Sequence, residues 1–353
     1  MLSRDLDFLG WTLKQAKSKD YSESKTEMAK GWQALNPKLE VKLVGIGIIE
    51  FRPTQASAKD IVLSCGVHGN ETAPIEICND LVNQILAGTL ECQHRLQVQF
   101  ANLDAMLIGE RFVEENLNRL FSGAHKGKTH KEAERARELE LATRDFFEAM
   151  PFEWESGERQ RCHYDLHTAI RDSAHPRFAI YPFRHGRPYR RSQLAFLNDC
   201  GVDTILLSEQ PTTTYSYYSS HQFEADAFTV ELGKVRPFGE NDHSQFAMAR
   251  ETLTALVSQS DIEWQADAWK GMNLYQIHQV INKGHEDFRL AFDDDTANFS
   301  AYAQGEPLAF ENGQAVPVLA KEERIVFPNA KVPVGQRALL TVVAADISER
   351  LTD

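Results

Sequence analysis

The stretch Ile61-Val-Leu-Ser-Cys-Gly-Val-His-Gly-Asn-Glu71 is an apolar run that ends in a histidine and a glutamate three residues apart. A short buried strand that bends into a helix is where α/β enzymes usually place their chemistry. Two His-x-x-Asp/Glu pairs occur, about as many as 12 His and 51 acidic residues would give by chance. The other pair, His221 with Glu224, lacks a preceding strand pattern. Position therefore favours His68 and Glu71 as the start of a zinc site.

The segments around this stretch alternate between strand and helix patterns. We expect a helical lead-in over residues 1 to about 40, strands over 39–51, 61–65, 96–100, 162–166, 177–183, 204–207 and 227–232, and helices over 75–88, 131–150, 192–199 and 243–258. This order predicts an α/β domain whose sheet is mostly parallel in its centre.

The pattern of predicted elements changes near residue 263. Short strand patterns over 274–281, 288–292, 307–310, 315–319 and 336–343 are separated by turns rich in Gly, Pro and Asp. This pattern is typical of a small β-rich domain. We therefore expect a catalytic domain over residues 1–262 and a β-rich domain over 263–353, docked on the first.

Composition narrows the class of protein. The 353 residues are 42% hydrophobic and can bury a large core, and the net charge of −13 argues against a nucleic-acid or anionic-membrane partner. The five Cys are odd in number and form no Cys-x-x-Cys pair, which favours reduced thiols and a cytoplasmic location. No apolar segment approaches a signal peptide or a membrane span. Composition leaves the oligomeric state open.

A third zinc ligand should also come from the end of a strand, and His167 directly follows the predicted strand over 162–166. Two His and one Glu form a catalytic zinc set whose fourth position is left for water or substrate. The alternative for His167 is an ordinary buried histidine. Asp165 suits a supporting role better than that of a ligand, and His163 and His175 stay undecided.

Glu231 is a lone acid in the apolar run Ala227-Phe-Thr-Val-Glu-Leu232. An unpaired carboxylate in a buried strand is costly unless it serves a purpose. Hydrolysis at a zinc site needs a carboxylate that takes a proton from water and passes it to the leaving amine. We expect Glu231 to fill this role, and the alternative is an edge-strand glutamate that faces solvent.

A dense polar run, Arg111-Phe-Val-Glu-Glu-Asn-Leu-Asn-Arg-Leu-Phe121, lies between the ligand segments. The pair Asn118 and Arg119 suits recognition of a carboxylate, and a second arginine suits an oxyanion. Without the other motifs, such a run would usually be a solvated loop.

Four ordered motifs together resemble a known family. His68-Gly-Asn-Glu71, Asn116-Leu-Asn-Arg119, Asp165-Leu-His-Thr-Ala-Ile-Arg171 and Val230-Glu-Leu-Gly-Lys234 are similar to motifs of the zinc carboxypeptidase superfamily, within its succinylglutamate desuccinylase and aspartoacylase branch. The match spans most of the chain and is closest on the desuccinylase side. It implies an α/β/α domain with a mixed sheet, followed by a barrel-like β domain.

The resemblance implies one zinc ion per subunit and hydrolysis of N-succinyl-L-glutamate, in arginine catabolism by the succinyltransferase route. His68, Glu71 and His167 would hold zinc, and Glu231 would be the general base and acid. Arg111 would stabilise the oxyanion. Asn118 and Arg119 would bind a substrate carboxylate.

The substrate carries three carboxylates, so we expect Arg171 to contribute to its binding, with Arg177, Lys234 and Arg236 as further candidates. One position departs from the family pattern: His221 stands where aspartoacylase-type sequences place an arginine. Two alternatives stay open, namely a deacylase of another acidic N-acyl amino acid, such as N-acetylaspartate, and a zinc- or ligand-binding protein without turnover.

Overall fold

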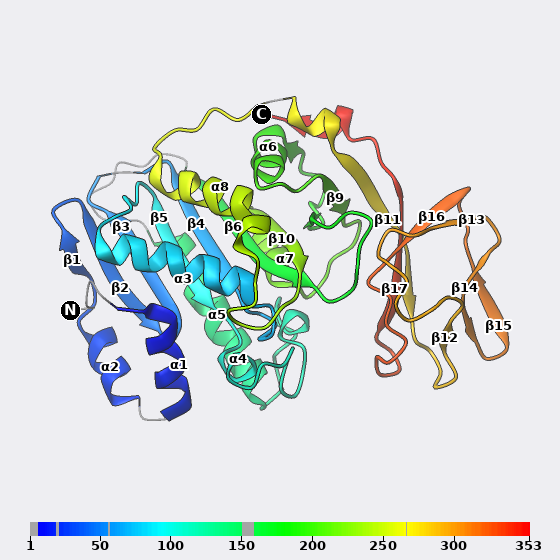
Figure 1. Ribbon diagram of the computed structural model, residues 1–353, viewed down its shortest axis with the longest axis horizontal. Coiled ribbons are helices and arrows are strands. Elements are labelled where there is room, and N and C mark those ends of the chain that lie inside the picture. The colour runs from blue at the N-terminus through cyan, green and yellow to red at the C-terminus, as the bar shows by residue number, and fades with distance from the viewer. Residues whose placement is uncertain (1–5, 19–20, 56, 150–158, 266) are drawn as a thin grey trace.

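The computed structural model describes residues 6–18, 21–55, 57–149, 159–265 and 267–353. Within these residues, 13 strands form one sheet in the order β1-β2-β3-β5-β4-β6-β10-β7-β9-β11-β17-β16-β13. Figure 1 shows helices on both faces of the larger part of this sheet and a β-rich part at one end. The sheet is the frame on which the candidate site residues are arranged.

The first part of the sheet comprises β1 (Gln33–Asn36), β2 (Leu39–Gly45), β3 (Ile48–Pro53), β4 (Lys59–Cys65), β5 (Arg95–Phe100), β6 (Gln160–Ala169), β7 (Phe178–Tyr181), β9 (Thr204–Leu207) and β10 (Asp226–Lys234). Its centre, β5-β4-β6-β10, is parallel, whereas β3 and β7 pair with it in the antiparallel sense. Central parallel strands are buried on both faces, which explains why every residue of β4 after Lys59 is buried. The expected mixed sheet with a parallel centre is confirmed.

Two helical layers cover the sheet. The helices are α1 (Phe8–Ser18), α2 (Ser22–Ala29), α3 (Thr72–Ala87), α4 (Leu103–Ile108), α5 (Lys131–Glu148), α6 (Arg191–Asp199), α7 (Tyr215–Phe223) and α8 (Ala247–Ser258). The helices α1, α3, α6 and α8 pack in one hydrophobic cluster, and α5 and α7 pack in a second one. In Figure 1, α3 and α8 lie in front of the sheet and α5 and α7 lie behind it. The α/β/α prediction is confirmed.

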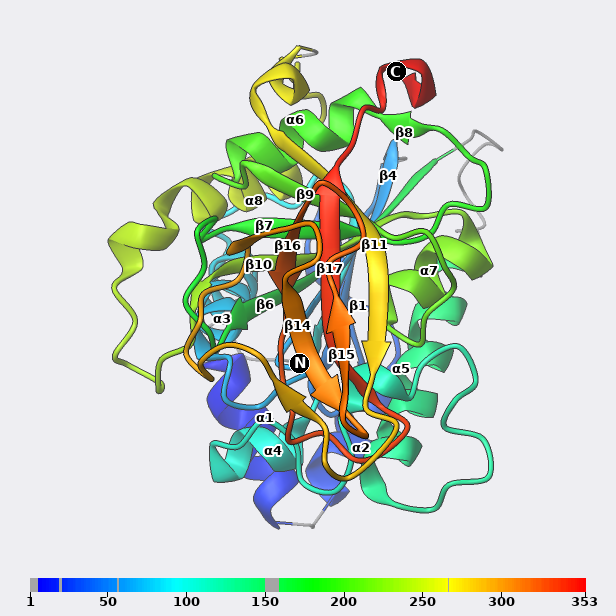
Figure 2. The same ribbon diagram turned by 90° about the vertical axis from the view of Figure 1, so that its right-hand side faces the viewer.

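The C-terminal region continues the same sheet. Its strands are β11 (Asn273–Asn282), β13 (Ala301–Ala303), β16 (Glu322–Val326) and β17 (Arg337–Ala344), while β12 (Arg289–Leu290), β14 (Pro307–Glu311) and β15 (Gln314–Pro317) form a separate sheet. Figure 2 views this β-rich region from its own side. The predicted β-rich domain is confirmed. Its boundary at residues 262 and 263 stays a prediction, because β9 pairs with β11 across it.

The remaining elements are short: β8 (Tyr189–Arg190), β18 (Leu351–Thr352), η1 (Leu117–Arg119), η2 (His243–Phe246), η3 (Ala268–Gly271) and η4 (Ser348–Arg350). The strand expected over 39–51 is a hairpin of β2 and β3, where Gly47 takes a φ of +74°. Residues 1–5, 19 and 20 of the expected lead-in and Met150 of the expected helix over 131–150 lie outside the described residues.

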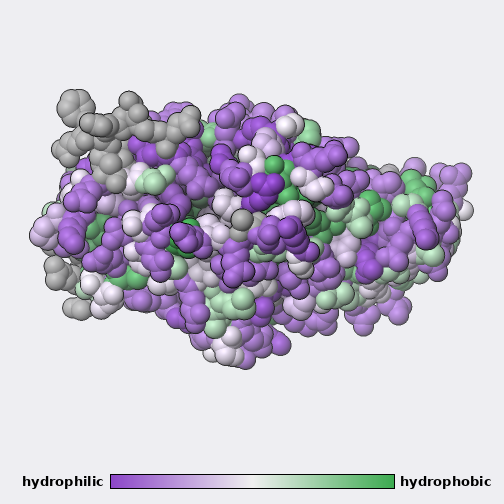
Figure 3. Space-filling view, turned by 90° about the horizontal axis from the view of Figure 1, so that it is seen from above, coloured by the Kyte–Doolittle hydropathy of each residue, from purple (hydrophilic) through white to green (hydrophobic). Residues whose placement is uncertain are grey.

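The face in Figure 3 is largely hydrophilic, with small apolar areas between the polar ones. Among the described helices, we find none with the length and apolar character needed to cross a bilayer.

Candidate active site

The turn between β4 and α3 carries the first two predicted ligands. His68 and Glu71 are buried, and Glu71 takes the N-cap position of α3 without capping it through its side chain. Gly69 is required between them, because a Cβ built there would lie 2.2 Å from the backbone carbon of Ala105 at α4. The tight packing of this turn on α4 directs both side chains toward β6.

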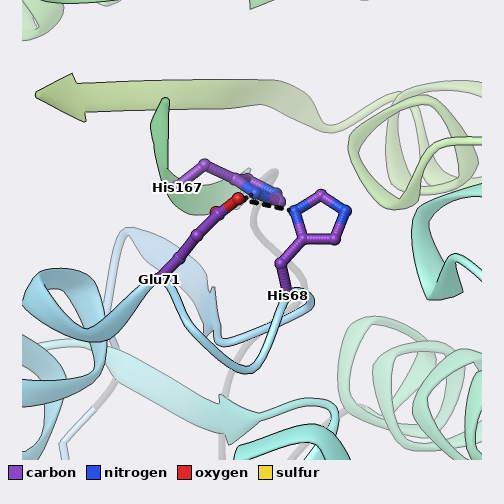
Figure 4. Close-up of side chains that lie close together, drawn as sticks. All are labelled: His68, Glu71 and His167. Atoms are coloured by element: carbon purple, nitrogen blue, oxygen red, sulfur yellow. Dashed lines mark hydrogen bonds and ion pairs between the residues drawn. The ribbon is translucent and has the colours of Figure 1, made fainter. Parts of the chain in front are cut away.

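His167 meets them from β6, which extends to Ala169 and therefore further than the predicted strand. The Nδ1 atoms of His68 and His167 each lie 2.8 Å from a different carboxylate oxygen of Glu71. Candidate ligand atoms of the three residues all lie within 4.8 Å of one another. Figure 4 shows the three side chains converging from two segments of the chain.

The Nε2 atoms of His68 and His167 also have hydrogen-bond partners. His68 Nε2 lies 3.0 Å from Asn116 Oδ1, and His167 Nε2 lies 2.9 Å from Asp165 Oδ2. Outer oxygen partners of this kind orient metal-binding imidazoles and fix which nitrogen carries the proton. The supporting position expected for Asp165 agrees with this geometry, whereas the contact of Asn116 was not predicted although the residue lies in a quoted motif.

Asp165 belongs to a longer buried network. Ser64 donates a hydrogen bond of 2.6 Å to Asp165 Oδ1 and lies 2.8 Å from His163 Nε2, and His163 Nδ1 lies 2.7 Å from Ser219 Oγ. Three elements, β4, β6 and α7, are thereby connected to the ligand His167 through polar groups in the core. His163, undecided from the sequence, thus supports the site from behind.

The electrostatic surroundings of the three candidate ligands differ. Burial, with the nearby Arg111, lowers the pKa of His68 to about 4, so that its imidazole is neutral near pH 7. Burial opposes ionisation of Glu71, but the two histidines outweigh it and hold the pKa well below its usual range. For His167, burial lowers the pKa, whereas Asp165 and Glu71 raise it more. Two imidazole nitrogens and a carboxylate match the donors of a catalytic metal centre.

Glu231 lies at the carboxyl end of β10, where it pairs in register with His167 of β6. It is 7% exposed, and its Oε2 is buried without a hydrogen-bond partner. Burial and the neighbouring Glu71 raise the pKa of Glu231 to about 7. A carboxyl with a pKa near neutrality can both take and give a proton, which a general base and acid must do.

Residues of the polar run 111–121 lie near this centre. Arg111 Nη1 donates a hydrogen bond of 2.8 Å to Glu71, and its backbone carbonyl accepts one from Gly69. Asn118 is buried and its Oδ1 accepts from the backbone N–H of Tyr215, while Arg119 Nη1 donates to the carbonyl of Asn118. Arg111 therefore reaches the ligand set. The substrate-binding roles of Asn118 and Arg119 stay predictions.

The other predicted substrate contacts are engaged with protein groups. Arg171 donates hydrogen bonds of 2.9 and 3.0 Å to the backbone carbonyls of Thr296 and Pro328, which belong to the β-rich region. Its role in substrate binding stays a prediction. Further candidates have partners too: Arg177 donates to Gln245 and Lys234 to Asp172.

His221, which departs from the family pattern, and His175, undecided from the sequence, both make aromatic contacts. His221 is exposed on α7, with its ring stacked on Tyr217 at 5.4 Å. His175 packs edge-on against Phe299, with ring centroids 4.8 Å apart. Neither contact includes a residue of the ligand set.

Two family models match the chain. Residues 57–257 match the succinylglutamate desuccinylase/aspartoacylase catalytic domain, and residues 270–345 match the AstE/AspA barrel-sandwich hybrid domain. The first match contains every candidate ligand and Glu231. The second match covers the strands β11 to β17.

Curated relatives and solved structures agree with the models. The chain is 49% identical over 339 residues to a succinylglutamate desuccinylase of Idiomarina loihiensis, covering 96% of this chain and 95% of the relative. It is 50% identical over 318 residues to one of Shewanella piezotolerans, covering 89% and 91%. The crystal structure of the Chromobacterium violaceum succinylglutamate desuccinylase superimposes with a TM-score of 0.83 at 37% identity, covering 99% of this chain and 100% of that one. The chain therefore belongs to the succinylglutamate desuccinylase/aspartoacylase family.

Proposed function

We propose that this chain hydrolyses N-succinyl-L-glutamate to succinate and L-glutamate with a bound zinc ion. The substrate is suggested by the name of the relatives that match nearly the whole chain. The observation that carries the reaction type is Glu231, a buried carboxyl with an unpartnered oxygen, in register with the candidate ligand His167. A proton acceptor beside a metal donor set is the arrangement that metal-assisted amide hydrolysis needs.

His68, Glu71 and His167 would hold the ion. When bound, zinc supplies acidified water and polarises a carbonyl group. Glu231 takes a proton as the water oxygen bonds to the succinyl carbonyl carbon. It then gives this proton to the amide nitrogen as the carbon–nitrogen bond breaks, so that glutamate leaves as an amine and the succinyl group as a carboxylate. Arg111 donates to the carbonyl oxygen as its negative charge develops.

The charged groups of the substrate need partners of the opposite sign. In this proposal Asn118 and Arg119 bind one carboxylate, because an arginine fork matches carboxylate geometry. Arg171 is a further candidate for this role. The reaction would complete arginine catabolism by the succinyltransferase route. A cytoplasmic setting agrees with the cysteines, which are free and buried.

The test is a zinc-dependent assay on a panel that contains N-succinylglutamate, N-acetylaspartate and other N-acyl amino acids. We expect the highest kcat/KM on N-succinylglutamate. Preference for N-acetylaspartate would instead indicate an aspartoacylase-type deacylase. Bound zinc without hydrolysis of any member of the panel would indicate a protein that binds but does not turn over.

Two variants separate metal binding from catalysis. His68→Ala removes a ligand and should lose zinc, as measured by metal analysis of the purified protein. Glu231→Ala should retain zinc and lose roughly 10²- to 10⁴-fold in kcat, the usual contribution of a general base. A Glu231→Ala protein with zinc and near wild-type activity would show that the role assigned to Glu231 is wrong.

A further inference from the structure

A third arginine joins Arg111 and Arg119 near the candidate site, and it comes from the β-rich region. Arg337 is the first residue of β17. Burial and the positive charges of Arg119 and Arg111 lower the pKa of Arg337 to about 9, and burial and Arg111 lower that of Arg119 to about 10. Arg337 of the β-rich region is thus close enough to feel the charges of Arg119 and Arg111, which come from the catalytic region.

This positive charge is not neutralised by the protein. Among the described residues, neither Arg119 nor Arg337 forms an ion pair with a carboxylate, and the Nε of Arg337 is buried without a hydrogen-bond partner. Elsewhere in the chain, the buried Arg95 is paired with Asp60 at 3.1 Å. Arg119 and Arg337 are half-buried, and charge that is partly removed from water without a partner of opposite sign is costly. Its presence beside a candidate catalytic centre indicates a site for an anionic ligand.

A chain of ring contacts links Arg337 to the centre. Its guanidinium lies over the ring of Phe327, 5.7 Å from the centroid. The Phe327 ring lies 5.7 Å from that of Phe178, and Phe178 pairs in register with Glu231. Arg337 is thus two aromatic rings away from the strand position of the candidate general base.

Phe327, whose ring contacts the Arg337 guanidinium, has an unfavourable backbone conformation. Phe327 has a φ of +52°, which bulky residues rarely adopt. Its N–H donates a hydrogen bond of 2.8 Å to the side chain of the buried Asn298. Backbone strain of this kind persists only where surrounding contacts impose it, and it clusters at ligand-binding sites. Here it fixes the ring on which Arg337 rests.

Stacking on a ring does not by itself explain the position of Arg337. Arg289, in the separate sheet of the same region, also stacks on a phenylalanine, with its guanidinium 4.2 Å from the Phe310 centroid. Arg289 is exposed to solvent. A structural cation–π contact in this region therefore needs neither burial nor two neighbouring arginines.

We propose that Arg337 binds a carboxylate of the substrate, together with Arg119, so that the β-rich domain supplies part of the substrate specificity. The assignment rests on the proposed function for the identity of the substrate. The chemistry is that of a polyanionic N-acyl amino acid, whose carboxylates can each accept two hydrogen bonds from a guanidinium fork.

The experiment compares Arg337→Met with Arg289→Met as the matched control. We expect Arg337→Met to raise KM for N-succinylglutamate by roughly 10- to 100-fold, the usual effect of losing a charged hydrogen bond, with a smaller change in kcat. Arg289→Met should leave KM within about twofold. Arg337→Lys, which keeps the charge but not the fork, should restore part of the loss. Zinc content and thermal unfolding of each variant report on its folding.

Substrate analogues identify the carboxylate. N-succinylglutamine, N-succinyl-4-aminobutyrate and N-butanoylglutamate each lack a different carboxylate of N-succinylglutamate. For one of them, Arg337→Met and wild type should have the same KM. An equal loss on all three analogues, or a KM for Arg337→Met like that of Arg289→Met, would overturn the proposal.

A binding measurement keeps the inference separate from the proposed function. Calorimetry measures the affinity of N-succinylglutamate for Glu231→Gln, with and without Arg337→Met, and requires no turnover. Weaker binding with Arg337→Met supports the substrate-binding role of Arg337, even if wild type fails to hydrolyse N-succinylglutamate. In that case only the proposed function fails. Turnover by wild type with unchanged binding in the Arg337→Met protein rejects the inference alone.

Discussion

The Glu231 carboxyl links the chemistry of the site to the stability of the protein. Its pKa of about 7 lies above the ordinary value of 4.5 because of burial and Glu71. A carboxyl whose pKa rises on folding favours the folded state when protonated. This contribution is complete below pH 4.5 and is lost as the pH rises through 7.

Glu231→Gln should therefore stabilise the metal-free protein at high pH, because glutamine cannot ionise in the buried site. We expect the free energy of unfolding at about pH 8 to rise by roughly 2–3 kcal/mol, and this gain to shrink as the pH falls toward 5. Urea titrations of chelator-treated protein at several pH values measure it. A difference that does not depend on pH would contradict the raised pKa.

At the scale of elements, the close approach of the β4–α3 turn to α4 leads to a prediction about Gly69. Gly69→Ala would bring a methyl group to 2.2 Å from the backbone of Ala105, so one of the two elements must shift. We expect a loss of about 1–3 kcal/mol of stability from overpacking. Zinc affinity should fall at the same time, because His68 and Glu71 flank the displaced residue.

Gly271→Ala is the control for this variant. The Cβ at Gly271 would meet no atom within 4 Å, and its backbone is not left-handed. Gly271→Ala should therefore leave zinc affinity and the free energy of unfolding nearly unchanged. Competition with a chromogenic chelator measures the affinity. Equal zinc affinity in the Gly69→Ala protein and wild type would show that the turn tolerates the shift without moving its ligands.

The sequence predicted elements whose own residues carry a regular pattern. The strand over Thr204–Leu207 has the predicted bounds, because a threonine is followed by three apolar residues and all four are buried. The helix α7 was missed, because Tyr215 and its neighbours are polar residues that become buried through distant partners. The Tyr215 hydroxyl, for example, donates to Gln99 across 116 positions of the chain. The short strands β13 and β16 were also not predicted.

The same distinction holds for the site. His68, Glu71, His167 and Glu231 each stand at or near the end of a strand, so their meeting follows from parallel strands with aligned ends. Arg337 carries no such local signal. Its position near Arg119 depends on how the β-rich region packs against the loop after α4, which spacing along the chain does not contain.

At the scale of the whole molecule, one sheet runs through both predicted domains. Strand β9 pairs with β11, and β11 with β17, so the backbone hydrogen bonds continue from the catalytic region into the β-rich one. Arg171 adds two hydrogen bonds across the same boundary. Regions joined in this way should lose their structure together.

We therefore expect one cooperative unfolding transition in calorimetry, with a calorimetric enthalpy close to the van't Hoff enthalpy. A fragment that ends before β11 would expose the edge of β9 and should aggregate. Two separate transitions, or a soluble and folded fragment of residues 1–262, would show instead that the domains are independent.

The polar network behind the site also bears on how the chain avoids misfolding. Ser64 and Asp165 are register partners in the β4–β6 ladder, and their side chains are hydrogen bonded. A slip of one residue would turn alternate side chains to the opposite face and leave the Asp165 carboxylate buried without a donor. Misaligned pairings of these strands are thereby penalised. The bonds that orient His167 in the finished protein thus also select the correct strand alignment while the sheet assembles.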